Sequence, residues 1–418
     1  MNIGIFTDTY YPQLSGVVTS IQTLTRQLEA QGHNVYIFTS TDPLVPKGTF
    51  ERNVFRFSSV PFVGFKERRI SYRGAIQGIV IARKLKLDIV HTQTEFSLGL
   101  MGKNVSTALR IPKIHTYHTN YEDYTHYVFN GKVLRPGAVR LLIRGFVHGM
   151  TAVVAPSKQT FETLMGYKVS SPIEIIPTGV KVNHDPSEDH SAELRADLSL
   201  DSDTPVVLVL GRVAFEKNIE AVIESFNEVL HGFPTAKLVI AGDGPALDTM
   251  KGHVASLGIE NSVIFTGYVD HEKAYSYYRL ADVFASASES ETQGLTYIEA
   301  ISADTPIVAI HNLYLDDRVT DENVGTLIDD QYELAEAISK YLAAKQANVV
   351  LGNPDARSKL LYDVDEVTFG QRIIDLYHEA LAVYRDHGDD DESEAAAADA
   401  EYASSFVLKN PFRRNNNA

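Results

Sequence analysis

Two carboxylates, Glu291 and Glu299, lie eight positions apart on either side of Gly294 in the stretch ESETQGLTYIEA. The preceding ADVFASAS predicts a short buried strand, and LTYIEAISA predicts a helix. Gly294 is then at a strand-to-helix corner, where free backbone N–H groups and the positive end of the helix dipole favour a phosphate. Because carboxylates accept hydrogen bonds from sugar hydroxyls, the spacing favours a ligand with both sugar and phosphate, although two solvated acids would give the same pattern.

Further candidate residues follow other predicted strands. Arg212 and Lys217 in GRVAFEKN come after PVVLVL and could neutralise a diphosphate, or be merely solvated. Gly242 and Gly244 follow AKLVIA and fit a phosphate loop or a tight turn. Val269 follows SVIFTGY and would give a base an apolar wall, or pack on the core. Ligands of doubly wound sheets bind at the carboxyl ends of strands, so these positions fit a ligand site.

The elements that would position these residues alternate between strand and helix along the chain. This alternation predicts an α/β fold with parallel sheets covered by helices on both faces. The pattern restarts after a polar connection at 181–204, which predicts two Rossmann-like doubly wound domains, 1–180 and 205–365, facing a central cleft. An amphipathic helix is expected at 366–387, and the acidic run 388–418 is expected to be largely disordered.

Composition narrows the class of protein. The 418 residues include no cysteine and no apolar stretch long enough to span a membrane, so we expect an unexported protein without disulfides or thiolate metal sites. The net charge of −16 is uneven, because residues 1–180 hold 20 Lys+Arg against 11 Asp+Glu and the remainder 18 against 43. A basic N-terminal half can bind an anionic surface. Nucleic acid is not the expected anion, because its common binding signatures are absent.

The motifs together resemble those of the retaining GT-B glycosyltransferases of family 4. The resemblance covers roughly residues 1–385 and implies a GT-B fold whose C-terminal helix crosses back. It also implies transfer of a sugar from a nucleotide sugar with retention of the anomeric configuration. Its motifs are Gly16 in SGV, His118 after IHTY, Arg212 and Lys217 in GRVAFEKN, and the Glu-x7-Glu element around TQGL.

The resemblance implies a role for each motif residue. His118 would sit by the transferred sugar and Glu291 would contact its hydroxyls, so these two form the expected catalytic pair. Neither glutamate need be a nucleophile, because in similar enzymes the leaving phosphate takes the acceptor proton. Arg212 and Lys217 would replace a metal at the diphosphate, so no metal and no cofactor are expected. The expected donor-binding residues are Gly16, Arg212, Lys217, Val269, Glu291, Thr292, Gln293, Gly294, Leu295 and Glu299.

Two basic and apolar segments in the N-terminal half favour a lipid acceptor at an anionic membrane. Segment 132–150 predicts a helix with basic and apolar stripes, typical of a membrane interface or of a core-packed helix with a solvated rim. Segment PFVGFKERR places two phenylalanines beside three cations. The expected membrane and acceptor contacts are Phe62, Phe65, Lys66, Arg68, Arg69, Arg140 and Arg144.

Several segments, among them FTDTYYPQLSGVVTSI, HTYHTNYEDYTHY and SETQGL, are most similar to bacterial 1,2-diacylglycerol 3-alpha-glucosyltransferases. This implies UDP-glucose as donor, diacylglycerol as acceptor, and a cytoplasmic enzyme at the inner face of the membrane that contributes to glycolipid or lipoteichoic acid synthesis. Thr178 in IPTGV departs from the asparagine common in the family. The alternatives are a transferase acting on a glycolipid, phosphatidylinositol or soluble acceptor, and a non-catalytic sugar-nucleotide-binding membrane adaptor; the oligomeric state is left open.

Overall fold

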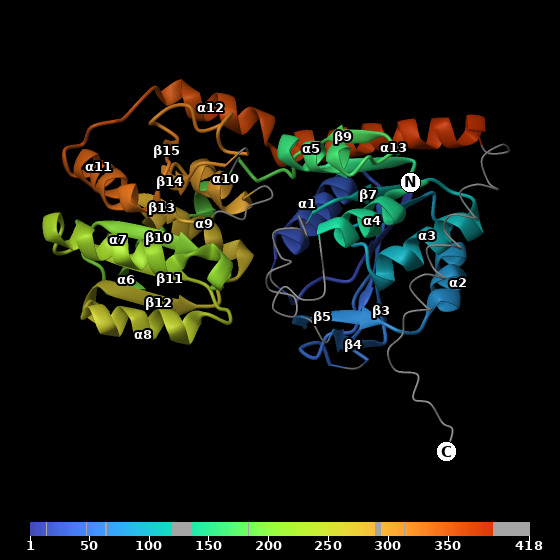
Figure 1. Ribbon diagram of the computed structural model, residues 1–418, viewed down its shortest axis with the longest axis horizontal. Helices are drawn as coiled ribbons and strands as arrows, with labels where there is room; N and C mark the ends of the chain where they lie inside the picture. The colour runs from blue at the N-terminus through green and yellow to red at the C-terminus, as the bar shows by residue number, and fades with distance from the viewer. Residues whose placement is uncertain are drawn as a thin grey trace, which may run out of the picture. The chain divides into compact units, whose positions relative to one another are not determined.

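The structure is a computed structural model that describes residues 1–13, 15–46, 48–62, 65–118, 136–182, 184–288, 294–312 and 314–387. For residues 62, 65–68, 136 and 385–387 it describes the backbone alone. The chain forms two compact units (Figure 1). The first consists of Met1–Pro177 and the chain from Gly370 onward, and the second of Thr178–Phe369.

The first unit is built on a parallel seven-stranded sheet of order β3-β2-β1-β6-β7-β8-β9. Its strands are rich in β-branched and aromatic residues, as in NVYIFTS, which forms β2. The strands are β1 (Asn2–Thr7), β2 (Asn34–Ser40), β3 (Val54–Phe57), β6 (Ile89–Thr92), β7 (Lys113–Thr116), β8 (Ala152–Ala155) and β9 (Ile173–Ile175). A separate antiparallel pair consists of β4 (Ser59–Phe62) and β5 (Phe65–Ser71).

Helices cover both faces of this sheet, because successive side chains of a strand point to opposite sides. Val90 packs with α2 and α3, whereas its neighbour His91 meets Tyr377 of α13 on the other face. From Gly370 onward, α13 belongs to the first unit, so the last helix crosses back to it. The helices are α1 (Gly16–Ala30), α2 (Ala75–Leu85), α3 (Ser97–Leu109), α4 (Pro136–Val147), α5 (Lys158–Gly166) and α13 (Glu366–His387).

The second unit has a parallel six-stranded sheet of order β12-β11-β10-β13-β14-β15. Alternate strand residues such as Val207 and Leu208 belong to different core clusters, one under α7, α8 and α11 and the other under α9, α10 and α12. The strands are β10 (Val206–Leu210), β11 (Lys237–Ala241), β12 (Val263–Gly267), β13 (Val283–Ser286), β14 (Ile307–Ile310) and β15 (Gly325–Ile328). The helices are α6 (Ser191–Asp197), α7 (Ile219–Gly232), α8 (Leu247–Leu257), α9 (His271–Leu280), α10 (Leu295–Ser302), α11 (Leu334–Gln346) and α12 (Pro354–Asp363), with short 3-10 turns at Pro186–Glu188, Phe215–Lys217, Glu260–Ser262 and Gln331–Glu333.

The polar segment 181–204 contains a helix, α6. Leu194 of this helix and Leu198, directly after it, pack on the second unit's core. The backbone N–H of His190 also donates to Ser276 Oγ of α9 at 3.0 Å. The segment therefore folds onto the second unit rather than serving only as a polar connection.

Each sheet reverses its strand order at one point, between β1 and β6 in the first unit and between β10 and β13 in the second. Parallel sheets of this kind are doubly wound and bind ligands outside the carboxyl ends of the strands at such a switch point. Functional residues are therefore expected at these two strand-end regions.

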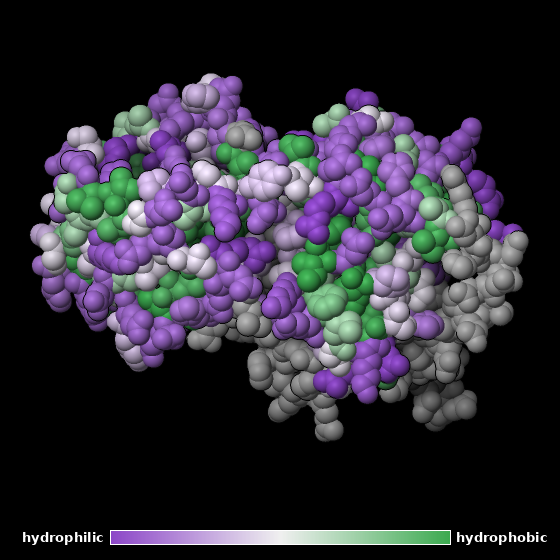
Figure 2. Space-filling model, turned by 90° about the horizontal axis from the view of Figure 1, so that it is seen from above, coloured by the Kyte–Doolittle hydropathy of each residue, from purple (hydrophilic) through white to green (hydrophobic). Residues whose placement is uncertain are grey.

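The described surface is mixed in polarity. Among the coloured residues in Figure 2, hydrophilic side chains surround separate apolar patches on both units. Among the helices that the structure describes, none combines the length and the apolar character that crossing a bilayer requires.

Candidate active site

In the first unit, a buried carboxylate ties the switch-point strands together. Asp8, directly after β1, accepts a hydrogen bond from Thr94 Oγ1 at 2.7 Å, just beyond β6. It also accepts from the Ser97 hydroxyl and, at 3.1 Å, from the backbone N–H of Leu98 in the first turn of α3. Burial raises the pKa of Asp8 above its usual value, and these hydrogen bonds oppose the rise. Asp8 thus fixes the start of α3 against β1 and shapes the strand-end edge.

His118 lies two residues beyond β7, at the same edge. Its Nε2 atom is 2.6 Å from Oε1 of Gln93, the first residue after β6. Burial, with a smaller repulsion from His115, lowers the pKa of His118 to about 3, so the ring is neutral at pH 7. With the amide oxygen accepting, Nε2 carries the proton and Nδ1 keeps a lone pair that can accept a hydrogen bond. The site therefore offers a neutral, oriented imidazole.

Two more histidines lie in the sheet beside His118, and both are completely buried. His91 contacts Tyr377 Oη at 2.7 Å and Thr116 Oγ1 at 2.8 Å through its two ring nitrogens. His115 Nε2 is 3.2 Å from Glu95 Oε1. Both rings are held by neighbours inside the first unit, so their role here is structural support of the strand ends.

Gly16 is the first residue of α1, which follows the loop after β1. Ser15 caps this helix, its Oγ accepting from the N–H of Val18 at 3.4 Å. Gly16 is exposed at the N-terminus of a 15-residue helix, a position whose dipole favours an anion.

In the second unit, the glycines after β11 serve close approach between backbones. A Cβ on Gly242 would lie 1.8 Å from Gly211 O, and one on Gly244 would lie 2.3 Å from Val213 O. Both glycines have positive φ, at +156° and +158°. These two positions therefore match the tight-turn alternative, in which the loops after β10 and β11 are pressed together.

Arg212 and Lys217 lie in the loop between β10 and α7, and both are half-buried. Arg212 forms an ion pair with Glu216, four residues further along the chain, through Nη2 and Oε1. Lys217 ends the 3-10 turn Phe215–Lys217 directly before α7. The loop therefore places two cations at the carboxyl end of β10, where the sequence predicts a diphosphate.

The predicted strand-to-helix corner is present. Gly294, at φ +61°, directly precedes α10, and a Cβ there would lie 2.4 Å from the Tyr297 ring. A side chain is therefore excluded by both conformation and space. The Tyr297 hydroxyl is in turn 2.9 Å from Ser286 Oγ of β13, which fixes the corner against the sheet.

Glu299 lies in α10 and is half-buried. The hydroxyl of Tyr278, in α9, donates to its Oε2 at 2.9 Å. Burial and the Glu299 charge raise the pKa of Tyr278 well above its usual value, so the tyrosine remains a donor. One carboxylate oxygen is thus held, which orients the group for a ligand.

The structure describes some of the other candidate residues and leaves the rest undescribed. Val269 and Leu295 are partly buried and pack on the second unit's core, so each has a structural role besides any contact with a base or phosphate. Glu291, Thr292 and Gln293 lie outside the described residues, as does the tail at 388–418.

The apolar stripe of α4 faces the protein core. Val139, Ile143, Phe146 and Val147 are buried with residues of β8 and α5, which fits the core-packed alternative and excludes insertion of this stripe into a bilayer. The opposite face is open, where Arg140 and Arg144 are exposed and Leu141 is 72% exposed. A membrane contact through α4 would have to use that basic face.

The PFVGFKERR segment forms the β4–β5 hairpin. Arg69 donates to Ser59 Oγ and Ser59 O, both at 2.9 Å, so it joins the two strands. The side chains of Phe62, Phe65, Lys66 and Arg68 lie outside the described part of the structure.

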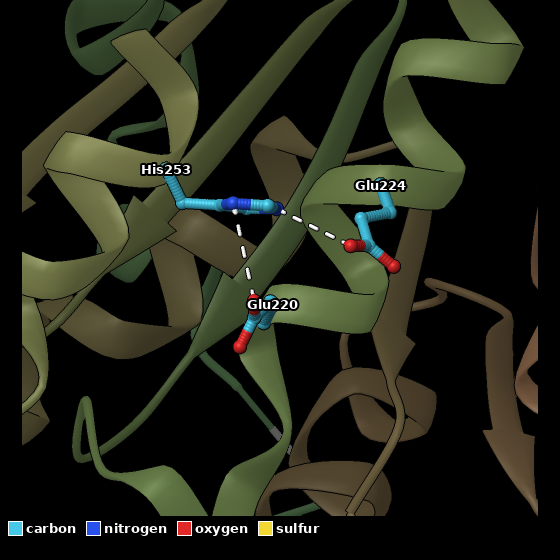
Figure 3. Close-up of side chains that lie close together, drawn as sticks. All are labelled: Glu220, Glu224 and His253. Carbon is cyan, nitrogen blue, oxygen red and sulfur yellow. Dashed lines mark ion pairs between the residues drawn. The ribbon is translucent and has the colours of Figure 1, made fainter. Parts of the chain in front are cut away.

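One cluster in the described residues has the composition of a metal site. His253 of α8 has its Nδ1 3.9 Å from Glu220 Oε1 and its Nε2 3.5 Å from Glu224 Oε1 (Figure 3). Both glutamates are exposed on α7, and the contacts are those of surface ion pairs. The cluster contains none of the predicted donor-binding residues, and the absence of a catalytic metal remains a prediction.

Gln93, Tyr278 and Asp8 are site residues that the sequence analysis did not identify. Gln93 stands after DIVHT, and a polar residue after a strand at the sheet edge was an available signal. No signal in the sequence indicated the pairing of Tyr278 with Glu299, because this contact depends on how α9 packs beside α10.

Comparison with known proteins gives the class to which this protein belongs. Residues 14–184 match the glycosyltransferase family 4 model and residues 190–354 the model of glycosyl transferases group 1. Sucrose-phosphate synthase from Thermosynechococcus elongatus superposes with a TM-score of 0.73 at 22% identity, over 91% of this chain and 99% of that one. Anabaena HepE, solved in complex with UDP-glucose, gives 0.71 at 17% identity over 91% and 100%. The fold is that of a GT-B glycosyltransferase.

Sequence relatives define the family more narrowly. Alpha-monoglucosyldiacylglycerol synthase of Streptococcus pneumoniae is 44% identical over 91% of this chain and 86% of its own length. The enzyme of that name in Acholeplasma laidlawii is 34% identical over 80% and 87%. The chain therefore belongs to the family of these synthases within glycosyltransferase family 4.

Proposed function

We propose that the protein transfers glucose from UDP-glucose to the free hydroxyl of 1,2-diacylglycerol with retention of the anomeric configuration. The product, a monoglucosyl diacylglycerol, would enter glycolipid and lipoteichoic acid anchor synthesis. The observation that carries this proposal is the 44% identity with the pneumococcal alpha-monoglucosyldiacylglycerol synthase over nearly the whole chain.

The described site supports the chemistry of this transfer. Breaking the bond between sugar C1 and the diphosphate oxygen leaves negative charge on the phosphate, which Arg212, Lys217 and the N–H groups at the Gly294 corner would stabilise. The acceptor oxygen forms the new bond to C1, and its proton passes to the leaving phosphate. No protein base is then required.

Recognition of the donor would use the remaining polar groups. Glu299, with one oxygen held by Tyr278, would accept hydrogen bonds from the ribose, and Glu291 from the sugar. The neutral ring of His118 would accept a hydrogen bond from a sugar hydroxyl through Nδ1. Because the ring stays uncharged, it adds no repulsion to the positive charge that develops on the sugar.

The acceptor side would work at an anionic membrane surface on the cytoplasmic side. Arg140 and Arg144, exposed on α4, provide cations for anionic headgroups, and the charge of residues 1–180 has the same sign. The basic face of α4, rather than its apolar stripe, would meet the bilayer.

A turnover assay tests the function. Purified protein is given UDP-glucose and diacylglycerol in anionic vesicles, and UDP release and lipid products are measured, with UDP-galactose and GDP-mannose as alternative donors. We expect UDP release that depends on diacylglycerol and is fastest with UDP-glucose. Release only with monoglycosyl lipid, or donor binding without release, would overturn the proposal in favour of a glycolipid-extending enzyme or a non-catalytic adaptor.

A further inference from the structure

An apolar groove of about 560 Å³ opens on the first unit between the end of β5, the first turn of α2 and the N-terminal half of α3. Its walls are largely hydrocarbon, from Ile70, Ile76, Phe96, Leu100 and Met101. The groove belongs to a single unit and contains none of the predicted catalytic or donor-binding residues. It is therefore separate from the predicted donor site, and it lies in the first unit, to which the proposed function assigns the acceptor.

Close packing of α2 against α3 forms the base of the groove, and its rim is open to solvent. Gly78 lets α2 pack against α3, because a Cβ there would lie 2.8 Å from Met101 Sδ. At the rim, large apolar side chains are left in solvent: Ile76 is 80% exposed and Tyr72 57% exposed. Exposed apolar side chains around a concave apolar surface are typical of a ligand groove.

One wall of the groove is bonded to the strand-end edge of the site. The backbone N–H of Ser71 donates to Ser97 Oγ at 2.8 Å, and the Ser97 hydroxyl donates to Asp8. Phe96 and Ser97 in this wall follow Gln93, the partner of His118, by three and four residues. A molecule lying in the groove can therefore extend toward the edge where His118 stands.

The chemistry of the lining selects the occupant. The lining contains one charged residue, Arg73, whose guanidinium lies over the Tyr72 ring at 5.6 Å. A sugar or a nucleotide would lose hydrogen bonds to water in such a groove, whereas a hydrocarbon chain would lose none. No acidic residue occurs from position 70 to 87, so the flank is cationic and complements an anionic lipid surface.

We propose that this groove holds one acyl chain of the lipid acceptor and directs the glycerol hydroxyl toward the strand ends. The inference rests on the proposed function, because it assumes an acylated acceptor. It adds to that function the place where the enzyme recognises the acyl chain of the acceptor.

The test uses short-chain diacylglycerols that are monomeric in water, so that binding to vesicles plays no part. Ile76→Glu puts a charge in the groove wall, and Val80→Glu puts the same charge one turn further along α2, on a side chain that is 45% exposed and outside the lining. Acceptor kcat/KM with UDP-glucose, UDP-glucose hydrolysis without acceptor, and the unfolding midpoint are measured for both variants.

For the wild type, each methylene that enters the groove should raise acceptor kcat/KM about fourfold until the groove is full. Ile76→Glu should lower kcat/KM for dioctanoylglycerol at least tenfold and flatten this dependence on chain length. Val80→Glu should remain within about twofold of wild type, and both variants should hydrolyse UDP-glucose at the wild-type rate. Equal losses in the two variants, or an unchanged chain-length dependence in Ile76→Glu, would overturn the groove assignment while leaving the function intact.

A binding measurement separates the groove from the function. Monooctanoylglycerol is titrated into wild type and both variants by calorimetry, with no donor present. Binding that only Ile76→Glu weakens supports the groove even if no diacylglycerol is glucosylated, in which case the proposed function alone fails. If wild type does not bind monooctanoylglycerol at concentrations at which dioctanoylglycerol saturates turnover, the groove assignment is overturned.

Discussion

The Nε2 atom of His118 lies 2.6 Å from the Oε1 atom of Gln93, so two neighbouring strands of the first unit together orient one imidazole. Among the described residues, Gln93 Nε2 has no hydrogen-bond partner although the side chain is buried. A buried amide that is half satisfied is suited to meet a ligand as well as the ring. We infer that Gln93 positions His118, whose ring is kept neutral by burial.

Gln93→Glu tests this positioning role. A carboxylate beside the ring favours the imidazolium, so the pKa of His118 should rise from about 3 toward its usual 6.5 or above. Nuclear magnetic resonance of the His118 ring would report this rise, and kcat should become pH-dependent between pH 6 and 8. Gln93→Leu, which cannot charge the ring, should lower kcat roughly tenfold or more without new pH dependence. A ring that titrates as in wild type in the Glu variant would contradict the role.

The lowered pKa of His118 also predicts a pH dependence of stability. The unfolded state binds a proton near pH 6.5, and the folded state binds it only near pH 3. The stabilisation from keeping the ring neutral is therefore complete above pH 6.5 and is lost as the pH falls toward 3. This group alone should lower the free energy of unfolding by about 2 kcal/mol from pH 7 to pH 5.

Urea unfolding of wild type and His118→Gln at both pH values measures this contribution, because His91, whose pKa is lowered mainly by its own burial, is present in both. The variant should lose about 2 kcal/mol less than wild type on acidification. Parallel losses would show that His118 titrates normally in the folded protein.

Tyr278→Phe tests whether an oriented Glu299 matters for the donor. The variant keeps the buried ring but removes a hydrogen bond to a charged group, so the Kd for UDP should rise roughly tenfold. Tyr341→Phe is the matched control, because its hydroxyl is 2.9 Å from Thr326 Oγ1 in the same unit and touches no candidate residue. Calorimetric titration of UDP measures the Kd of both variants. A similar Kd in the two would show that the hydrogen bond from Tyr278 to Glu299 does not contribute to donor binding.

Arg212→Gln should lower kcat about a hundredfold, because it removes a preplaced cation from the leaving phosphate. Arg195→Gln changes a different cation of the second unit, one whose guanidinium donates to the backbone oxygens of Thr204 and Leu280. It should lower the unfolding midpoint while leaving kcat within a few-fold of wild type. Steady-state kinetics and thermal unfolding distinguish the two, and an equal fall in kcat would remove Arg212 from the proposed mechanism.

The combined substitution Arg140→Glu with Arg144→Glu should reduce co-sedimentation with anionic vesicles while hydrolysis of UDP-glucose persists. Lys158→Glu with Lys168→Glu makes the same change in charge at exposed positions in and just after α5. If only the α4 pair weakens binding, the basic face of that helix meets the membrane. Unchanged co-sedimentation of the α4 variant would reject the assignment.

Much of the fold follows from local sequence patterns. The β2 strand and the Gly294 corner were predictable because apolar runs and glycines act within a few residues. The sequence patterns were misleading where the outcome depends on how elements pack in three dimensions. Periodicity gives α4 an apolar stripe but does not reveal that β8 and α5 cover it, and the polarity of 181–204 conceals α6.

The residues of the candidate site also fall into those that the sequence indicated and those that it did not. Residue types near strand ends indicated Arg212 and, behind the Gly294 corner, Glu299, because parallel sheets bind ligands at that edge. His118 was indicated by the family resemblance. Gln93 and Tyr278 contact these residues across 25 and 21 positions of sequence. Such pairs depend on the order of strands and the packing of helices, which no local pattern encodes.

The most direct measurement is the structure of the lipid made from UDP-glucose with 13C at the sugar C1 and 1,2-diacylglycerol. Mass spectrometry should find one hexose on the diacylglycerol, and the C1–H1 coupling should show the alpha anomer, as retention requires. Labelled glucose found only in water, or a beta-linked product, would contradict the account.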